Sequence, residues 1–118
     1  MNKLYGMLGL CARARRLVTG EEASERLIRS GACKVAFLDE SASQNAAKAI
    51  TNACRTYEVP LIAIPPEQLG RAIGKPGRKA AATADASFAR RMIEIYRLLS
   101  GVHELNVKSQ DPGRNQGT

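Results

Sequence analysis

The chain has 118 residues, a formal net charge of +7 and a hydrophobic content of 44%. This length accommodates one domain with a substantial core but not two domains, and no run of eighteen apolar residues is long enough for a membrane-spanning helix. The charge is large for so small a domain and favours a polyanionic partner.

The first predicted element is a helix, because Leu4, Met7, Leu8 and Cys11 recur at helical spacing. Residues 1–11 also resemble a weak signal peptide. Two glycines interrupt its apolar part, however, and three arginines follow where a small-residue cleavage site is expected. We therefore interpret this segment as a helix of the mature protein and expect a cytoplasmic location.

A second helix is predicted after residues 17–18, a short apolar pair that suits one rung of a strand. Thr19 is expected to be the N-cap, and Glu22, three residues further on, completes the pattern of a capping box. The helix should continue to about Ser30, where Gly31 ends it.

Three short apolar runs, 35–38, 61–64 and 80–84, predict buried strands. Their alternation with helices predicts an α/β fold, a three-layer α/β/α sandwich with a small mixed sheet. We place this domain at residues 1–101. Residues 102–118 are rich in Asn, Gln, Ser, Pro and Gly and form a predicted disordered tail, since they cannot bury enough surface to order themselves.

Local signals place the remaining helices. Ser43 is expected to cap the third helix, Pro66 to lie in the first turn of a short fourth helix that reaches Leu69, and Asp85 to cap the last helix. The predicted inner faces are Ala46, Ile50, Ala53, Cys54 and Tyr57 in the third helix, and Phe88, Met92, Ile95, Tyr96 and Leu99 in the last.

The segment 69–79 contains four basic residues, three glycines and a proline. Its glycines allow close approach of the backbone to a ligand, and its charge and N–H groups suit a phosphate-bearing partner. It is not a P-loop, because three residues instead of four separate Gly70 from Gly74 and because Pro76, not Ser or Thr, follows Lys75. A solvated surface loop is the alternative interpretation.

The basic residues gather in two clusters, which strengthens the expectation of a polyanion. A membrane surface is the weaker alternative, because neither cluster carries the aromatic or large apolar face of an interfacial helix. The first cluster is Arg13, Arg15 and Arg16; the second is Arg71, Lys75, Arg78 and Lys79.

The cysteines do not form a reactive or metal-binding pattern. Cys11, Cys33 and Cys54 are far apart, without a CxxC pair, and the single histidine, His103, lies in the polar tail. We expect three reduced, buried thiols, with no metal, no cofactor and no catalytic residue.

Several motifs together, in this order and spacing, resemble the YlxQ-like bacterial proteins. These belong to the superfamily of small ribosomal proteins that bind kink-turn RNA, which includes the archaeal ribosomal L-seven-Ae protein. The resemblance covers about residues 3 to 100. It implies a four-stranded mixed sheet between helices, RNA binding without catalysis, and kink-turn or ribosomal RNA, or the ribosome, as partner. The motifs lie at residues 8–14, 18–22, 45–50, 59–62, 69–75 and 85–89.

In that family the start of the second helix contacts the bent RNA at its tandem G·A pairs, and the loop before the last strand covers an extruded base. The resemblance therefore implies an RNA-binding surface at the start of the second helix and another on the basic loop of residues 75–79. This chain departs from the archaeal pattern, with Glu22 in place of Asn, Arg26 in place of Lys, and a basic loop in place of an apolar one. The expected RNA-binding residues are Gly20, Glu21, Glu22, Arg26, Arg15, Arg16, Lys75, Arg78 and Lys79.

The types of these residues suit the implied roles. A carboxylate such as Glu22 can accept hydrogen bonds from guanine amino and imino groups, although it can equally cap its own helix. Arg26 can reach a phosphate or a guanine edge. Two other functions stay open: a mononucleotide-binding or enzyme accessory domain that uses the basic glycine-rich loop, and a protein-interaction module that uses its helices.

Overall fold

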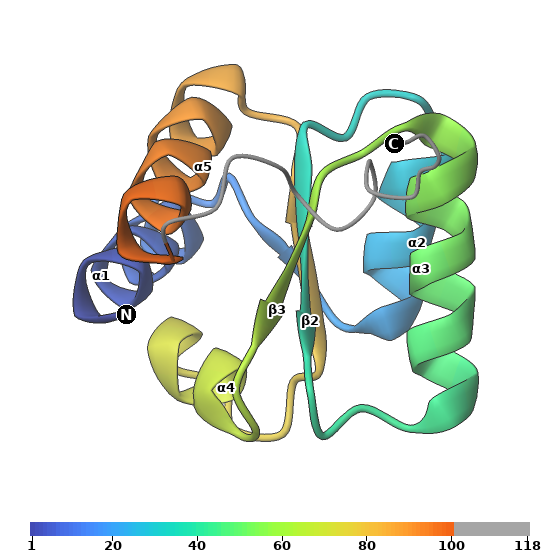
Figure 1. The fold of residues 1–118 in the computed structure, drawn as a ribbon, viewed down its shortest axis with the longest axis horizontal. Helices are drawn as coiled ribbons and strands as arrows, with labels where there is room; N and C mark the ends of the chain where they lie inside the picture. Colours follow the sequence, from blue (N-terminus) through green and yellow to red (C-terminus); the bar gives the residue numbers. More distant parts are fainter. Residues whose placement is uncertain (101–118) are drawn as a thin grey trace.

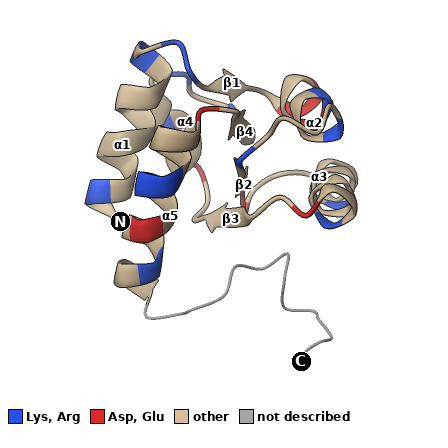
Figure 2. Cartoon of the chain, turned by 90° about the horizontal axis from the view of Figure 1, so that it is seen from above, with Lys and Arg blue, Asp and Glu red and all other residues tan. Residues whose placement is uncertain are grey.

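The computed structural model describes residues 1–100, so the predicted tail at 102–118 and the predicted helix end at Gly101 lie outside the described residues. The predicted three-layer α/β/α arrangement is confirmed: α2 and α3 cover one face of the sheet, and α1, α4 and α5 cover the other (Figures 1 and 2). The elements are α1 (Asn2–Arg13), β1 (Val18–Thr19), α2 (Glu21–Arg29), β2 (Val35–Asp39), α3 (Gln44–Tyr57), β3 (Leu61–Ile64), α4 (Gln68–Ile73), β4 (Ala80–Thr83) and α5 (Ala86–Ser100).

The sheet is mixed and has four strands in the order β1-β4-β2-β3. β2 and β3 are parallel, whereas β4 runs antiparallel to both β1 and β2. The backbone N–H of Gly20 donates to the carbonyl of Ala80 at 2.8 Å, and that of Asp39 donates to the carbonyl of Lys79 at 2.8 Å. The start of α2, the start of β4 and the end of β2 therefore meet at one end of the sheet.

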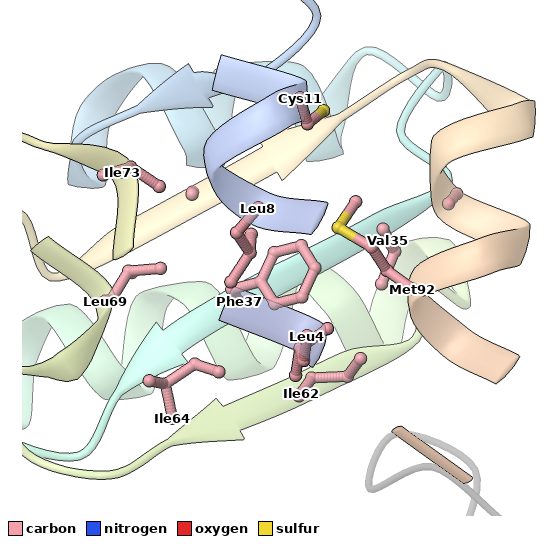
Figure 3. Packing of buried hydrophobic residues seen from close by; sticks show 12 residues of the cluster. Leu4, Leu8, Cys11, Val35, Phe37, Ile62, Ile64, Leu69, Ile73 and Met92 are labelled. Atoms are coloured by element: carbon pink, nitrogen blue, oxygen red, sulfur yellow. The ribbon is translucent and has the colours of Figure 1, made fainter. Parts of the chain in front are cut away.

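The larger part of the core lies between the sheet and the layer of α1, α4 and α5. Figure 3 shows Phe37 of β2 at its centre, with Leu4 and Leu8 of α1 and Met92 of α5 around it. These side chains are fully buried, and their burial is the main stabilising contribution to the packing of this helix layer. The second core lies under α2 and α3 and consists of Ile28, Cys33, Ala36, Ile50, Ala53, Cys54, Val59, Leu61, Ala80 and Ala82.

The prediction of three reduced, buried cysteines is confirmed, since Cys11, Cys33 and Cys54 are all free and buried. Burial raises the pKa of the Cys33 thiol to about 11 and that of the Cys54 thiol to about 12. Burial also raises the pKa of Cys11. The thiols are therefore protonated at neutral pH and poor nucleophiles.

The predicted capping box at the start of α2 is wrong. Thr19 pairs with Ala81 in the sheet, and the N-cap is Gly20, whose φ of 102° and ψ of 154° suit only glycine. No side chain within residues 1–100 caps the helix. Glu22 is thus the second helical residue and does not occupy the third position that a capping box requires.

The predicted boundary of the fourth helix is also wrong. Pro66 lies outside α4, which begins at Gln68 and extends to Ile73, so Arg71 belongs to a helix and not to the basic loop. Gly70 is buried, and a Cβ there would lie 2.8 Å from the Lys75 carbonyl oxygen and 2.9 Å from the Gly77 nitrogen. Gly70 therefore lets the loop fold back onto α4 and does not approach a ligand.

Two other predicted caps are confirmed. The Ser43 hydroxyl accepts from the N–H of Ala46 at 3.2 Å, and the Asp85 carboxylate accepts from the N–H of Phe88 at 2.9 Å. The prediction that Tyr57 and Leu99 lie on inner faces is wrong, since their side chains are 41% and 48% exposed. Both lie in the last turn of their helices, where the helix extends beyond the core. No helix in residues 1–100 is long and apolar enough to cross a membrane.

Candidate functional site

The structure brings the start of α2 and the basic loop together, although they are more than fifty residues apart in the chain. A Cβ added to Gly20 would lie 3.7 Å from Nη1 of Arg78. The Arg78 guanidinium therefore lies over the glycine at the N-terminus of α2. That terminus has no side-chain cap, which leaves backbone N–H groups of the first turn open to an external acceptor.

A groove of about 260 Å³ begins directly beside this point, between α2 and the N-terminal half of α3. Glu21, Glu22 and Glu25 line its α2 side, and Ser43 and Asn45 line the α3 side. Three carboxylates on one wall form an acidic strip in a chain whose net charge is +7. Such a strip repels phosphate and accepts hydrogen bonds from amino and imino donors.

Arginines flank the acidic strip. Arg26 is exposed one turn after Glu22, and Arg78 is exposed at the opposite side of Gly20. Neither takes part in the three ion pairs that are found within residues 1–100. Arg29 differs, because its Nε donates to the Glu25 carboxylate at 2.9 Å.

The loop between α4 and β4 uses its own backbone groups. The N–H of Lys75 donates to the Gly70 carbonyl at 2.9 Å, and the N–H of Arg78 donates to the Lys75 carbonyl at 3.2 Å. The N–H of Gly74 donates to the Arg71 carbonyl at 3.3 Å. The loop therefore offers side-chain cations at Lys75 and Arg78 and not the row of free N–H groups that cradles a nucleotide phosphate.

Lys79 lies in a different environment from Lys75 and Arg78. Its Nζ donates to the Ser41 hydroxyl at 2.7 Å and to the Glu67 carboxylate at 3.1 Å, and its side chain is 23% exposed. The loop itself thus already occupies two of the three donors of the ammonium group.

Arg15 and Arg16 lie at the opposite end of β4 from Gly20 and Arg78. The backbone carbonyl of Arg16 accepts a hydrogen bond from the Thr83 hydroxyl, and the Nε atom of Arg16 lies 3.6 Å from the Asp85 carboxylate. Both arginines line a separate groove of about 260 Å³ with Leu17, Val18, Leu27, Ala84 and Asp85. The structure therefore places them near Leu27 in the C-terminal half of α2, and not in one groove with Glu21 and Glu22 at its start.

A larger groove lies elsewhere. About 760 Å³ in volume, it lies between α1 and α5 on the other helix layer and is lined by Met7, Leu10 and Leu98, with Arg13 and Arg91 at its edge. Lys and Arg are spread over both helix layers (Figure 2), so basic charge alone does not distinguish the site. The site is distinguished by three features that lie close together: the glutamates of α2, the N-terminus of α2 without a side-chain cap, and arginines that form no ion pair within residues 1–100.

Sequence reasoning missed the residues that hold this end of the sheet together, Asp39, Ser41 and Glu67. Asp39 is 1% exposed and accepts four hydrogen bonds. The sequence shows only that the carboxylate of Asp39 follows a buried apolar run. It does not show which groups donate hydrogen bonds to this carboxylate. No group of three or more His, Cys, Asp or Glu side chains within residues 1–100 is arranged to hold a metal ion.

These features define a small, basic α/β/α domain whose charged chemistry lies in surface grooves and loops. The chain belongs to the Ribosomal protein L7Ae/L30e/S12e/Gadd45 family, whose pattern matches residues 2–93.

It is 39% identical over 92 residues to "RNA-binding protein YlxQ" of Bacillus subtilis (strain 168), covering 77% of this chain and 92% of that protein. It is 35% identical over 94 residues to the protein of the same name in Enterococcus faecium, covering 79% and 90%. A solved structure of a protein with unknown function from Bacillus halodurans C has a TM-score of 0.75 and 33% identity, covering 80% of this chain and 97% of that one.

Proposed function

We propose that this protein binds structured RNA through the N-terminal end of α2 and the loop between α4 and β4. The observation that carries the proposal is the acidic groove of Glu21, Glu22 and Glu25 beside Arg26 and Arg78, which form no ion pair within residues 1–100. The family membership supports it, as do the two relatives named as RNA-binding proteins.

The two kinds of charge have different roles in this proposal. Arg26, Lys75 and Arg78 contact phosphates and fix the position of the RNA, because phosphate contacts orient a complex without reading sequence. Glu21 and Glu22 accept hydrogen bonds from unpaired or sheared bases, since a phosphate offers no donor to a carboxylate. An RNA with a bulge or kink presents such base edges, whereas the deep major groove of a plain duplex hides them.

The finer partner that we propose is a kink-turn or ribosomal RNA, with the ribosome as a cellular site of action in the cytoplasm. The proposal contains no catalytic step. The mononucleotide alternative is less favoured, because the N–H groups of Gly74, Lys75 and Arg78 donate to carbonyls of the chain itself. Arg15 and Arg16 remain candidate RNA contacts, but on a surface at the other end of β4.

The first experiment compares three ligands under identical conditions: an RNA with a kink-turn bulge, a plain duplex of equal length, and ATP. We expect preference for the bulged RNA, weak binding of the duplex, and no saturable binding of ATP. Affinity should fall with salt on a log–log slope of roughly −2 to −5, since three to six phosphates are within reach of the basic side chains. Equal affinity for both RNAs across the salt series would leave only a non-specific polyanion binder.

The second experiment tests base reading by Glu22→Gln. The carboxylate is not a capping group, so removing its charge costs only a few tenths of a kcal/mol through the helix dipole. If Glu22 reads a base, affinity for the bulged RNA falls by roughly 1–3 kcal/mol, while duplex affinity stays level or rises.

The matched control is Glu94→Gln, which removes the same charge from an exposed position on α5. It should leave the preference for the bulged RNA unchanged. If the Glu22 variant also keeps its full preference, the specificity does not come from this carboxylate.

A further inference from the structure

We propose that Asp39, Ser41, Glu67 and Lys79 form a polar ring that positions the RNA-contacting loop, and that Lys79 is a positioning residue and not a phosphate contact. This inference rests on the proposed function for its effect on RNA. The ring itself rests on contacts within the free protein.

The ring is closed by hydrogen bonds that are mutually consistent. The Ser41 hydroxyl donates to Oδ1 of Asp39 at 2.5 Å and accepts from Nζ of Lys79 at 2.7 Å, so its single proton and one of its two lone pairs are used. Nζ of Lys79 also donates to Oε2 of Glu67 at 3.1 Å. The backbone N–H of Glu67 then donates to Oδ1 of Asp39 at 2.9 Å and completes the circuit.

The ring joins three separate segments of the chain, since Asp39 and Ser41 belong to one segment and Glu67 and Lys79 to two others. Asp39 ends β2, Ser41 lies before α3, Glu67 precedes α4, and Lys79 is the last residue before β4. Two of these segments bound the basic loop on either side. A salt bridge between Glu67 and Lys79 therefore fixes the distance between the entrance of α4 and the exit of the loop.

The backbone at the entrance of α4 depends on this support. Glu67 has φ 69°, a left-handed conformation that is uncommon for a residue other than glycine and persists only where neighbours determine it. α4 has six residues and no side-chain cap at its own N-cap, and Oδ2 of Asp39 accepts from the Leu69 N–H at 3.1 Å in its place. The carboxylate at the end of β2 thus caps a helix from another part of the chain.

Lys79 is poorly suited to bind a phosphate, because the other charged groups of the ring are carboxylates. The ring contains two carboxylates and one ammonium group, so its formal charge is −1. The neighbouring Arg78, by contrast, is exposed and lies beside Gly20 at the start of α2. The Lys79 side chain in the ring and the hydrogen bond from the Asp39 N–H to the Lys79 carbonyl fix the backbone at Lys79. This backbone orientation sets the direction of the preceding residue, Arg78.

Glu67→Gln separates positioning from electrostatics because the two predict opposite signs. Removal of a negative charge near a polyanion site raises affinity if only charge matters. If the ring positions the loop, the neutral amide weakens the link to Lys79, and affinity for the bulged RNA falls about 3- to 10-fold. The matched control is Glu40→Gln, which removes an exposed charge next to Asp39 without touching the ring. It should leave affinity level or slightly raised.

Lys79→Met completes the experiment. We expect it to lower affinity about as much as Glu67→Gln with an unchanged salt slope, and the double variant to bind no worse than either single variant. A salt slope shallower by about one unit for Lys79→Met, with raised affinity for Glu67→Gln, would identify Lys79 as a phosphate contact and overturn the inference.

A measurement without RNA separates this inference from the proposed function. Amide hydrogen exchange of the full chain, followed by NMR, should show at least fivefold faster exchange at Leu69, Lys75 and Arg78 in both ring variants, with α3 and α5 unaffected. Unchanged exchange at these amides would refute the ring as a positioning device even if RNA affinity changes. Failure of the wild-type protein to bind any RNA would refute the proposed function and leave the exchange result to decide the ring.

Discussion

Replacement of Asp39 by Asn is expected to be the most damaging single polar substitution at the end of the sheet that carries the proposed RNA site. The carboxylate is 1% exposed, and both of its oxygens accept hydrogen bonds. Asn keeps the shape but exchanges one acceptor oxygen for an NH₂ donor. If the NH₂ group takes the place of Oδ2, the N–H of Leu69 faces another donor. If it takes the place of Oδ1, the N–H groups of Ser41 and Glu67 do.

The magnitude follows from the number of partners. A buried donor left without an acceptor costs about 1–3 kcal/mol. The remaining hydrogen bonds change from charge-assisted to neutral ones, which are roughly half as strong. Together these terms predict a loss of about 3 kcal/mol in the free energy of unfolding, or a Tm lower by roughly 10–20 °C for a domain of this size.

The pH dependence provides a second signature. Burial acts to raise the pKa of Asp39, but hydrogen bonds from Ser41, Glu67 and Leu69 outweigh it and hold the pKa below the ordinary value of 3.8. A carboxylate with a depressed pKa stabilises the folded state above its unfolded pKa, and this contribution disappears as pH falls through the folded pKa. The difference between wild type and Asp39→Asn should therefore be constant near neutral pH and shrink below about pH 4.

Urea unfolding followed by circular dichroism between pH 3 and pH 7 measures both quantities. Asp85→Asn is the comparison, since Asp85 also caps a helix but accepts a single such bond, from Phe88, and is less buried. Its cost should be about 0.3–1 kcal/mol, because Asn caps a helix about as well as Asp and only the charge near the helix N-terminus is lost. A cost for Asp39→Asn no greater than that of Asp85→Asn would refute the assignment of Asp39 as the centre of this hydrogen-bond network.

Other predictions concern packing, thiol reactivity and charge. Gly70→Ala should destabilise by about 1–3 kcal/mol in thermal unfolding because its Cβ meets backbone atoms at 2.8 and 2.9 Å. Gly6→Ala, whose Cβ meets nothing within 4 Å on α1, should stabilise by about 0.5–1 kcal/mol. Iodoacetamide should not modify Cys54 until urea unfolds the chain; modification of the native protein would show that the core opens. Arg78→Ala should weaken all RNAs and shallow the salt slope by about one unit, whereas the exposed Arg90 on α5 should tolerate alanine; equal effects would argue against a localised site.

Much of the fold could be predicted because its signals are local. The periodic apolar residues of α1, α3 and α5 and the apolar runs of β2 and β3 define those elements without reference to the rest of the chain. Ser43 and Asp85 cap helices through bonds to residues three positions away, which sequence spacing reveals. The prediction of three buried thiols succeeded for the same reason, since each cysteine has apolar neighbours in sequence.

The errors occur where distant segments determine local structure. Thr19 has the composition of an N-cap, but pairing with Ala81 draws it into the sheet, so that Gly20 takes the cap position. The entrance of α4 could not be located because its cap is supplied by Asp39, 30 positions before Leu69. The partners of Lys79 lie 38 and 12 positions away, so the sequence does not reveal them, and the assignment of Lys79 to the RNA surface stays a prediction.

The acidic groove is the strongest argument that the proposed interface selects among RNAs and does not simply attract them. In a chain with a net charge of +7, Glu21 and Glu22 oppose the approach of any polyanion, whereas Arg29 pairs with the charge of Glu25. They contribute to binding only if the ligand brings donors to them, and nucleobases have such donors whereas phosphates do not. The role that we propose for Arg78, whose guanidinium lies beside Gly20, is to fix the RNA backbone at one distance from that groove. For selection among RNAs, a rigid loop therefore matters more than an additional cation. A mobile loop would let Arg78 bind phosphates at positions along the RNA where no base reaches the glutamates.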